Sequence, residues 1–218
     1  MPGYETRKLD VRVGKENFLI RALSDKQQYA DPDGAAARAG ISSATWSLFG
    51  QLWPASHALA RKMHKTDIEN RRILEIGCGL GLASLVLQRR GADITASDYH
   101  PLAEPFLNYN ADLNQLPPVA YYDLPWERPT PALGRFDLII GSDILYERDH
   151  ADILARLIER HAEPRSEVII TCPGRGYRGR FSRALEAQGY QLTQKQKRFE
   201  DDETPPYRGQ LLRFRRDH

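Results

Sequence analysis

Three glycine residues, Gly77, Gly79 and Gly81, alternate with single other residues directly after a short apolar run. Glycine lets the backbone approach a ligand closely, and the N-terminus of a following helix offers unpaired N–H groups to negative charge. The dinucleotide fingerprint G-x-G-x-x-G requires a small third residue, but that position falls on Leu82 when counted from Gly77 and on Ser84 when counted from Gly79. The loop therefore predicts a nucleotide-like ligand and argues against a nicotinamide dinucleotide.

Two acidic residues accompany this loop, Glu75 within the preceding strand and Asp98 at the end of the next one. A carboxylate at Asp98 would accept hydrogen bonds from two vicinal ribose hydroxyls, and Glu75 would orient the ammonium group of an amino-acid moiety, directly or through water. S-adenosylmethionine (SAM) carries both a ribose and an amino acid, so these residues predict it as the cofactor. The structural alternatives are a tight turn for the glycines and a helix cap for Asp98.

The elements that must position these residues alternate between strand and helix. The apolar patterning predicts strands at 72–76, 93–98, 119–124, 136–142 and 167–172, and helices at 82–88, 101–113, 149–161 and 178–188. Two further strands, at 192–199 and 210–215, have no helical pattern between them and should be antiparallel. Alternation with right-handed crossovers predicts an α/β fold with a doubly wound sheet and helices on both faces.

Ahead of this pattern, segments 6–13 and 17–23 flank Gly14 and predict a β-hairpin. Residues 24–40 are polar and small and predict a mobile loop that would serve as a lid. A short amphipathic helix is expected at 56–65. The chain should therefore carry an N-terminal extension on one α/β domain.

The ends of the predicted strands supply the candidate binding residues, because ligands of doubly wound sheets bind beyond the carboxyl ends of the strands. This rule selects 75–81, 98, 123–126, 142–146 and 172–176. Arg175 and Tyr177 follow the fifth strand and are predicted to contact the substrate. Cys78 and Cys172 end strands that the usual order separates by one strand, which is too far for a disulfide, so both should be free thiols.

The motifs ILEIGCGLG at 73–81, TASD at 95–98 and FDLIIGSDILY at 136–146 resemble the class I, seven-stranded SAM-dependent methyltransferases. The resemblance covers about residues 45–216 and implies a Rossmann-like doubly wound seven-stranded sheet with an antiparallel C-terminal strand pair. Three further features resemble the D-x-x-Y branch of protein-lysine methyltransferases, in particular the bacterial electron-transfer-flavoprotein lysine methyltransferases. They are LWP at 52–54, DLPW at 123–126 and GSDILY at 141–146.

The resemblance implies that six residues line the SAM site: Trp53, Gly77, Gly79, Asp98, Trp126 and Ser142. It places Trp126 against the adenine, although packing in the core is an equally common use of tryptophan. Neighbouring residues at the strand ends complete the predicted cofactor site, namely Glu75, Cys78, Gly81, Tyr99, Asp123 and Leu124.

Asp143 and Tyr146 are the predicted catalytic residues, because they stand where the methyl acceptor should arrive. A lysine acceptor has an ordinary pKa near 10.4 and must lose a proton first, which burial favours by penalising the charged form. Asp143 would anchor the incoming ammonium, and Tyr146 would form a hydrogen bond at the same amine. The structural alternative is that Asp143 caps a turn on which Tyr146 packs.

The sequence around Asp143 also bears on the substrate. Methyltransferases of DNA bases or glutamine amides commonly share an Asn/Asp-Pro-Pro-Tyr/Phe loop here, and this chain lacks the two prolines. Its 31 basic and 29 acidic residues leave a net charge of +2, which further argues against nucleic acid. A protein lysine is the predicted acceptor. The alternatives are a small amine or heteroaromatic nitrogen, or a non-catalytic SAM-binding interaction module.

Length and composition agree with an ordinary enzyme domain. The 218 residues suggest a hairpin and substrate-facing loop at 1–44 followed by a methyltransferase domain at 45–218. With 41% hydrophobic residues and a mean hydropathy of −0.57, neither a membrane span nor a secretory signal is expected. Two cysteines favour a reducing cytoplasm, and the scattered histidines predict no metal site.

Overall fold

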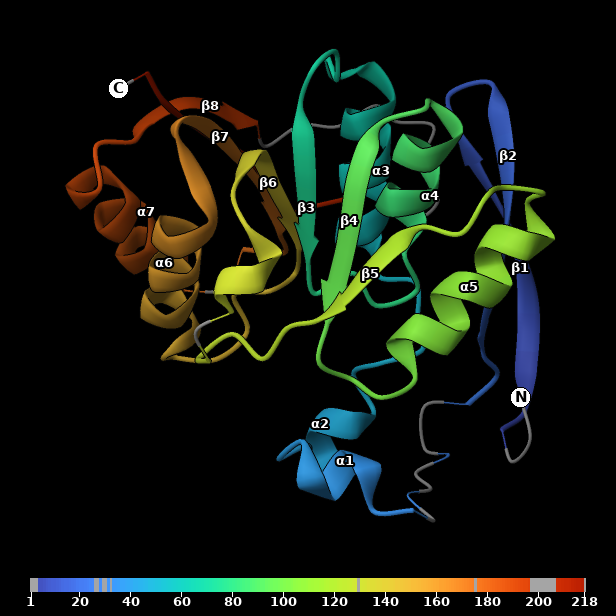
Figure 1. Ribbon diagram of the computed structural model, residues 1–218. Coiled ribbons are helices and arrows are strands. Elements are labelled where there is room, and N and C mark those ends of the chain that lie inside the picture. The colour runs from blue at the N-terminus through green and yellow to red at the C-terminus, as the bar shows by residue number, and fades with distance from the viewer. Residues whose placement is uncertain are drawn as a thin grey trace.

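The computed structural model describes residues 4–217 except 26–27, 29–30, 32, 129, 175 and 197–206. A central sheet of seven strands has the order β5-β4-β3-β6-β7-β9-β8 (Figure 1). Its strands are β3 (Arg72–Ile76), β4 (Asp93–Asp98), β5 (Ala120–Asp123), β6 (Phe136–Ser142), β7 (Ala162–Cys172), β8 (Gln191–Gln196) and β9 (Gln210–Arg216). The first five are parallel, and β9 is antiparallel to both of its neighbours. The predicted doubly wound sheet with an antiparallel C-terminal pair is confirmed.

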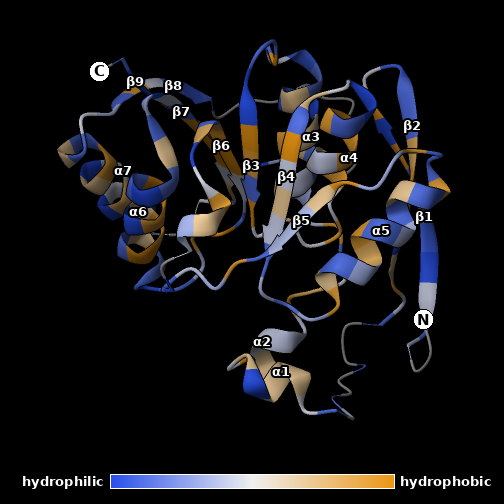
Figure 2. Cartoon of the chain, viewed as in Figure 1, coloured by the Kyte–Doolittle hydropathy of each residue, from blue (hydrophilic) through white to orange (hydrophobic). Residues whose placement is uncertain are grey.

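Helices cover both faces of this sheet (Figure 1). One layer contains α3 (Pro54–Lys65), α4 (Leu82–Arg89) and α5 (Ala103–Leu113), and the other contains α6 (His150–His161) and α7 (Arg178–Ala187). Successive strand residues point to opposite faces, so Ile73 packs under the first layer and Leu74 under the second. Because both faces are buried, the central strands contain apolar stretches such as 138–140 in β6 and 168–170 in β7, and the hydropathy colouring shows orange segments in the sheet (Figure 2).

The predicted N-terminal hairpin consists of β1 (Thr6–Val13) and β2 (Glu16–Leu23), a separate antiparallel sheet. An isolated hairpin is marginal in water, and here α5 supplies the missing neighbour. The Asn114 side chain accepts from Leu19 N at 2.9 Å and donates to Leu19 O at 2.7 Å. Asn110 accepts from Arg21 N at 2.7 Å in the same way. Two asparagine amides thus take the place of a third strand along the free edge of β2.

The segment predicted as an irregular loop at 24–40 contains a short helix, α1 (Ala35–Arg38), and a second one, α2 (Ser43–Trp46), follows it. The Asp31 carboxylate accepts from the N–H groups of Ala36 and Ala37, both at 2.9 Å, and so starts α1. Helices of four residues are too short to produce a hydrophobic period, which is why the patterning did not reveal them.

Other differences concern the ends of elements. Strand β7 begins at Ala162 instead of residue 167. Its pairing with β6 shifts register between Phe136 and Leu138, and its pairing with β9 begins only at Ser166. Pro164, which has no N–H to donate, is therefore tolerated in this strand. The predicted strand end at 197–199 lies outside the described residues. No helix in the described part of the chain is long and apolar enough to cross a bilayer.

Candidate functional site

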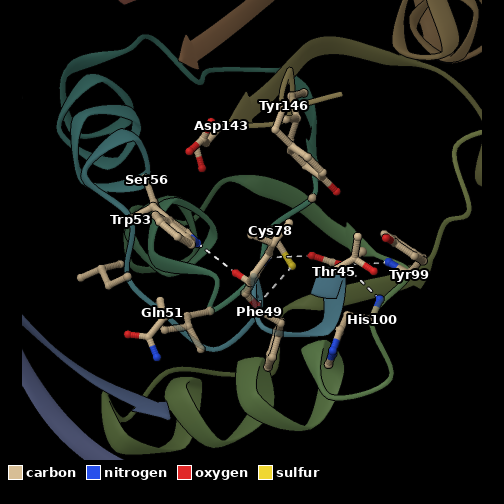
Figure 3. Close-up of a pocket in the computed structure, with 18 of the residues that line it drawn as sticks. Thr45, Phe49, Gln51, Trp53, Ser56, Cys78, Tyr99, His100, Asp143 and Tyr146 are labelled. Atoms are coloured by element: carbon tan, nitrogen blue, oxygen red, sulfur yellow. Dashed lines mark hydrogen bonds between the residues drawn. The ribbon is translucent and has the colours of Figure 1, made fainter. Parts of the chain in front are cut away.

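A pocket opens at the carboxyl ends of β3, β4 and β6, where the doubly wound topology predicts a ligand (Figure 3). Its empty space is about 840 Å³, with the open mouth included. Ten of the predicted site residues line it: Trp53, Gly77, Cys78, Gly79, Asp98, Tyr99, Trp126, Ser142, Asp143 and Tyr146. The fold therefore brings most of the predicted site together from five separate segments.

The glycine loop is shaped for close approach by a ligand. Gly77 has φ 64° and Gly79 has φ 54°, a backbone region that side chains rarely adopt. A Cβ at Gly77 would lie 2.9 Å from Ile144 Cγ2, whereas a Cβ at Gly79 would meet nothing within 4 Å. Gly79 thus faces the open space of the pocket. Gly81 starts α4 with φ 78°, and a Cβ there would collide with Leu107, so this glycine serves packing.

Asp98 holds the glycine loop against the end of β4. Its carboxylate accepts backbone N–H groups from Gly79 at 2.9 Å, Tyr99 at 2.8 Å and His100 at 3.0 Å. Burial raises the pKa of this carboxyl above its ordinary value, although the three donors act in the opposite direction. The side chain is 8% exposed at the pocket wall. It is therefore a preorganised acceptor at the ligand edge of the sheet.

Glu75, Gly81, Asp123 and Leu124 were predicted in the site but do not line the pocket. Glu75 is fully buried, and its carboxylate accepts hydrogen bonds from both the N–H and the hydroxyl of Ser84. Burial raises the pKa of Glu75 to about 7. Glu75 thus anchors the first turn of α4 from below the loop, while Leu124 donates its N–H to Asp98 O at 3.0 Å and secures the end of β5.

Trp126 packs in the pocket wall through its aromatic ring. His150 meets it edge-on at 4.9 Å between ring centroids, and Tyr99 lies at 6.3 Å. The Trp126 carbonyl accepts from the Arg160 guanidinium at 2.8 Å. Within the described structure, its indole Nε1 is buried and has no hydrogen-bond partner. A buried donor without a partner is costly, so this atom is suited to a ligand acceptor.

Asp143 and Tyr146 lie on the opposite side of the pocket from Phe49 and His100 (Figure 3). Asp143 adopts φ 53°, a left-handed conformation in which aspartate is enriched, and its N–H donates to Thr171 O at 2.8 Å. Tyr146 packs edge-on against His150 at 4.4 Å. Burial raises the pKa of the Tyr146 phenol, so the hydroxyl stays protonated. A carboxylate and a neutral hydroxyl therefore face the same space.

The wall between α2 and α3 was missed by sequence reasoning, apart from Trp53. Its other lining residues are Thr45, Leu48, Phe49, Gln51 and Leu52. The Trp53 indole donates to Leu48 O at 3.0 Å, and the Gln51 amide donates to Leu23 O at 3.2 Å. The apolar run at 48–53 has neither a strand nor a helix period. That irregularity, just ahead of the helix expected at 56–65, was the available signal for a wall segment.

His100 and Ser56 also line the pocket without having been predicted, and so do Leu80 and Ile144, which fall in the ranges that the strand-end rule selected. The His100 ring stacks on Phe49 with centroids 4.2 Å apart, and burial lowers its pKa to about 4. His100 is therefore neutral and supports the wall. Arg175 lies outside the described residues, and Tyr177, at the start of α7, does not line the pocket.

Both cysteine residues are buried free thiols, and one strand, β6, separates the strands that they end. In the described part of the chain, no three His, Cys, Asp or Glu side chains are grouped so that they could hold a metal ion.

Comparison with known families decides the assignment, because the model of a family described as lysine methyltransferase matches residues 42–187. The chain belongs to the lysine methyltransferase family. The match includes every predicted site residue, from Trp53 to Tyr146.

Two curated relatives bear names that agree with this family. The chain is 29% identical to protein N-lysine methyltransferase METTL21A of Danio rerio over 73% of its own length and 78% of that protein. It is 28% identical to the electron transfer flavoprotein beta subunit lysine methyltransferase of Xenopus laevis over 60% of its own length, and the match spans 52% of that relative. A third, histone-arginine methyltransferase METTL23 of Xenopus laevis, is 30% identical over 66% of this chain and 62% of that protein.

Solved structures share the fold. One is the T. thermophilus 16S rRNA N2 G1207 methyltransferase in complex with AdoMet and guanosine. The superposition covers 97% of this chain and 51% of the methyltransferase chain, with a TM-score of 0.66 and 16% sequence identity. The ribosomal protein L11 methylase of Lactobacillus delbrueckii subsp. bulgaricus covers 74% of this chain and 80% of its own, with TM-score 0.56 and 21% identity. The lysine methyltransferase family is an enzyme family of this fold, and the protein is a SAM-dependent methyltransferase.

Proposed function

We propose that this methyltransferase transfers the methyl group of SAM to the side-chain amine of a lysine in a protein substrate. The observation that carries the proposal is the joint placement of Asp143 and Tyr146 in the pocket that the glycine loop opens. Membership of the lysine methyltransferase family supports the same acceptor.

The residues present fit the cofactor. The open space beside Gly79, the carboxylate of Asp98 and the partnerless Nε1 of Trp126 offer the close backbone approach, the acceptor and the donor that an adenosyl group requires. Bound SAM supplies an electrophilic methyl group on a sulfonium. We assign its adenosyl half to Asp98, Tyr99 and Trp126, and its amino-acid half to the glycine loop and Trp53.

The chain's own contribution to catalysis is positioning and desolvation. The Asp143 carboxylate attracts the lysine ammonium into the pocket, and the protonated hydroxyl of Tyr146 forms a hydrogen bond that fixes the direction of the amine. Burial of the amine among Trp53, Ile144 and Tyr146 penalises its charged form and so favours loss of the proton before transfer.

We propose a protein as the substrate because the names of the relatives METTL21A, electron transfer flavoprotein beta subunit lysine methyltransferase and METTL23 all state protein substrates. In this proposal residues 1–44 form a substrate-facing cover on a methyltransferase domain at 45–218. The carbonyl of Leu23, which ends β2, accepts from Gln51 in the pocket wall and supports a link between cover and site. The buried free thiols support a reducing compartment such as the cytoplasm.

The test uses methyl-deuterated SAM, the purified protein and an extract of its source cells. Mass spectrometry should find the label on a lysine ε-amine of a discrete protein, and Asp98→Ala should abolish it. Label confined to small molecules would replace the protein substrate with a small amine. Label on arginine would replace lysine, in line with the METTL23 relative. No label above the Asp98→Ala control would contradict methyl transfer to these substrates.

A further inference from the structure

Thr171 is a fully buried residue one position before the end of β7. Its register partner in β6 is Ser142, and its partner in β9 is Leu211. Thr171 directly follows the buried apolar residues 168–170 and must satisfy its hydroxyl, because a buried hydroxyl without a partner is costly. The hydrogen-bond partner of this hydroxyl lies 116 residues away in the sequence.

Thr171 forms two hydrogen bonds that join two segments of the pocket wall. Its hydroxyl donates to the carbonyl oxygen of Ala55 at 2.7 Å, in the first turn of α3. Its own carbonyl accepts from the N–H of Asp143 at 2.8 Å. Ala55 lies between Trp53 and Ser56, both of which line the pocket. One buried residue therefore joins the wall that carries Trp53 to the residue that is assigned to the acceptor amine.

The connection matters because Asp143 holds a left-handed backbone conformation with φ 53°. Such a conformation persists in a residue other than glycine only where the surroundings determine it. The bond to Thr171 O is the backbone contact that does so, while the Thr171 hydroxyl fixes the distance from that point to α3.

We propose that Thr171 is a positioning residue that sets the separation between Asp143 and the first turn of α3, and thereby the geometry in which the acceptor amine meets the methyl group. This inference deepens the proposed function and rests on it. The glycine loop on the cofactor side has backbone contacts that do not involve Thr171, because Gly79 and His100 donate to Asp98 and Cys78 N donates to Ser97 O at 2.9 Å. Loss of the Thr171 hydroxyl should therefore affect turnover more than SAM binding.

Thr171→Val keeps the shape of the side chain and removes the donor to Ala55. The matched control is Ser166→Ala. Ser166 is a buried residue of the same strand that does not line the pocket, and its hydroxyl forms a hydrogen bond with the Tyr190 hydroxyl at 2.7 Å. With the protein substrate in hand, Thr171→Val should lower kcat about tenfold, since small misplacements of reacting groups cost this much or more. SAM affinity should stay within about threefold, and Thr171→Ser should restore kcat. Ser166→Ala should leave kcat unchanged.

Amide hydrogen exchange tests the geometry without any acceptor. Thr171→Val should raise exchange in both 53–57 and 142–146, and Ser166→Ala should raise it in neither. If Thr171→Val and Ser166→Ala have equal kcat and equal exchange in these segments, the inference is wrong even when lysine methylation is real. If no protein is methylated but the exchange pattern holds, the proposed function fails and Thr171 still joins the two walls.

Discussion

The two halves of the pocket are held together in different ways. On the cofactor side, the main contact joins Gly79 to Asp98, 19 residues apart, within one strand-loop-helix-strand unit. On the acceptor side, the Thr171 hydroxyl reaches Ala55, 116 residues away. The first half is therefore determined mainly by local structure, and the second depends on the assembled sheet. The contrast implies that each half can be damaged while the other continues to work.

Asp143 gives the largest expected effect. Both Asp143→Ala and Asp143→Asn remove the carboxylate that faces the acceptor, so kcat should fall about a hundredfold in each, a typical loss for one electrostatic contact. Asparagine tolerates the left-handed backbone and alanine does not, so only Asp143→Ala should also lose about 1 kcal/mol of stability. Chemical unfolding beside steady-state kinetics measures both quantities. An Asp143→Asn variant with wild-type kcat would remove Asp143 from the acceptor site.

Gly79→Ala changes the cofactor side of the pocket. Its Cβ would enter the open pocket, so SAM should bind about thirtyfold more weakly because the methyl group takes ligand space. The left-handed backbone at φ 54° adds a strain of roughly 1–2 kcal/mol, which lowers the stability of the folded state. Gly91→Ala is the matched control, because Gly91 has φ 73° and its Cβ would also meet nothing within 4 Å, at the far end of α4. Both variants should lose similar stability, and only Gly79→Ala should lose SAM affinity by calorimetry. Equal SAM affinity in the two would contradict the role of the loop.

The contrast also explains which parts were predictable from the sequence. Gly77, Gly79 and Asp98 follow apolar strands with the spacing that a ligand-binding loop requires, so local patterning found them. The doubly wound arrangement followed from the alternation of strands and helices with right-handed crossovers. Thr45 and Phe49 belong to no motif, and tertiary contacts alone bring them to the pocket. Thr171 lies buried behind the pocket wall and belongs to no motif either. Glu75 differs from these residues, since it stands at a motif position but lies below the pocket and bonds to Ser84.

Glu75 provides a pH test of that packing role. Its pKa is about 7 in the folded protein against an ordinary 4.5, so between these values the folded state binds the proton more tightly than the unfolded state. Stability contributed by the protonated form is therefore lost as pH rises from about 4.5 to about 7. Glu75→Gln should show a flatter decline in Tm between about pH 5 and about pH 8. The raised pKa of Asp98 leaves a residual slope of the same sign, and an unchanged slope in Glu75→Gln would refute the assignment.

Gln51→Ala gives the smallest expected effect. It removes the amide donor to Leu23 O, so SAM affinity should fall about threefold and stability by about 1 kcal/mol, the usual worth of a neutral hydrogen bond. Gln88→Ala is the control, because the Gln88 amide donates to the carbonyls of Pro117 and Pro118 away from the pocket. Loss of SAM affinity in Gln88→Ala as well would point to a general loss of stability.

The independence of the two halves is the central claim, and calorimetric titration of SAM into Asp98→Asn and Asp143→Asn tests it most directly. Asp98→Asn removes a charged acceptor of three N–H groups and should weaken SAM binding about tenfold or more. Asp143→Asn should bind SAM within about threefold of wild type. If Asp143→Asn loses as much SAM affinity as Asp98→Asn, the pocket is one coupled unit and the division into cofactor and acceptor halves is wrong.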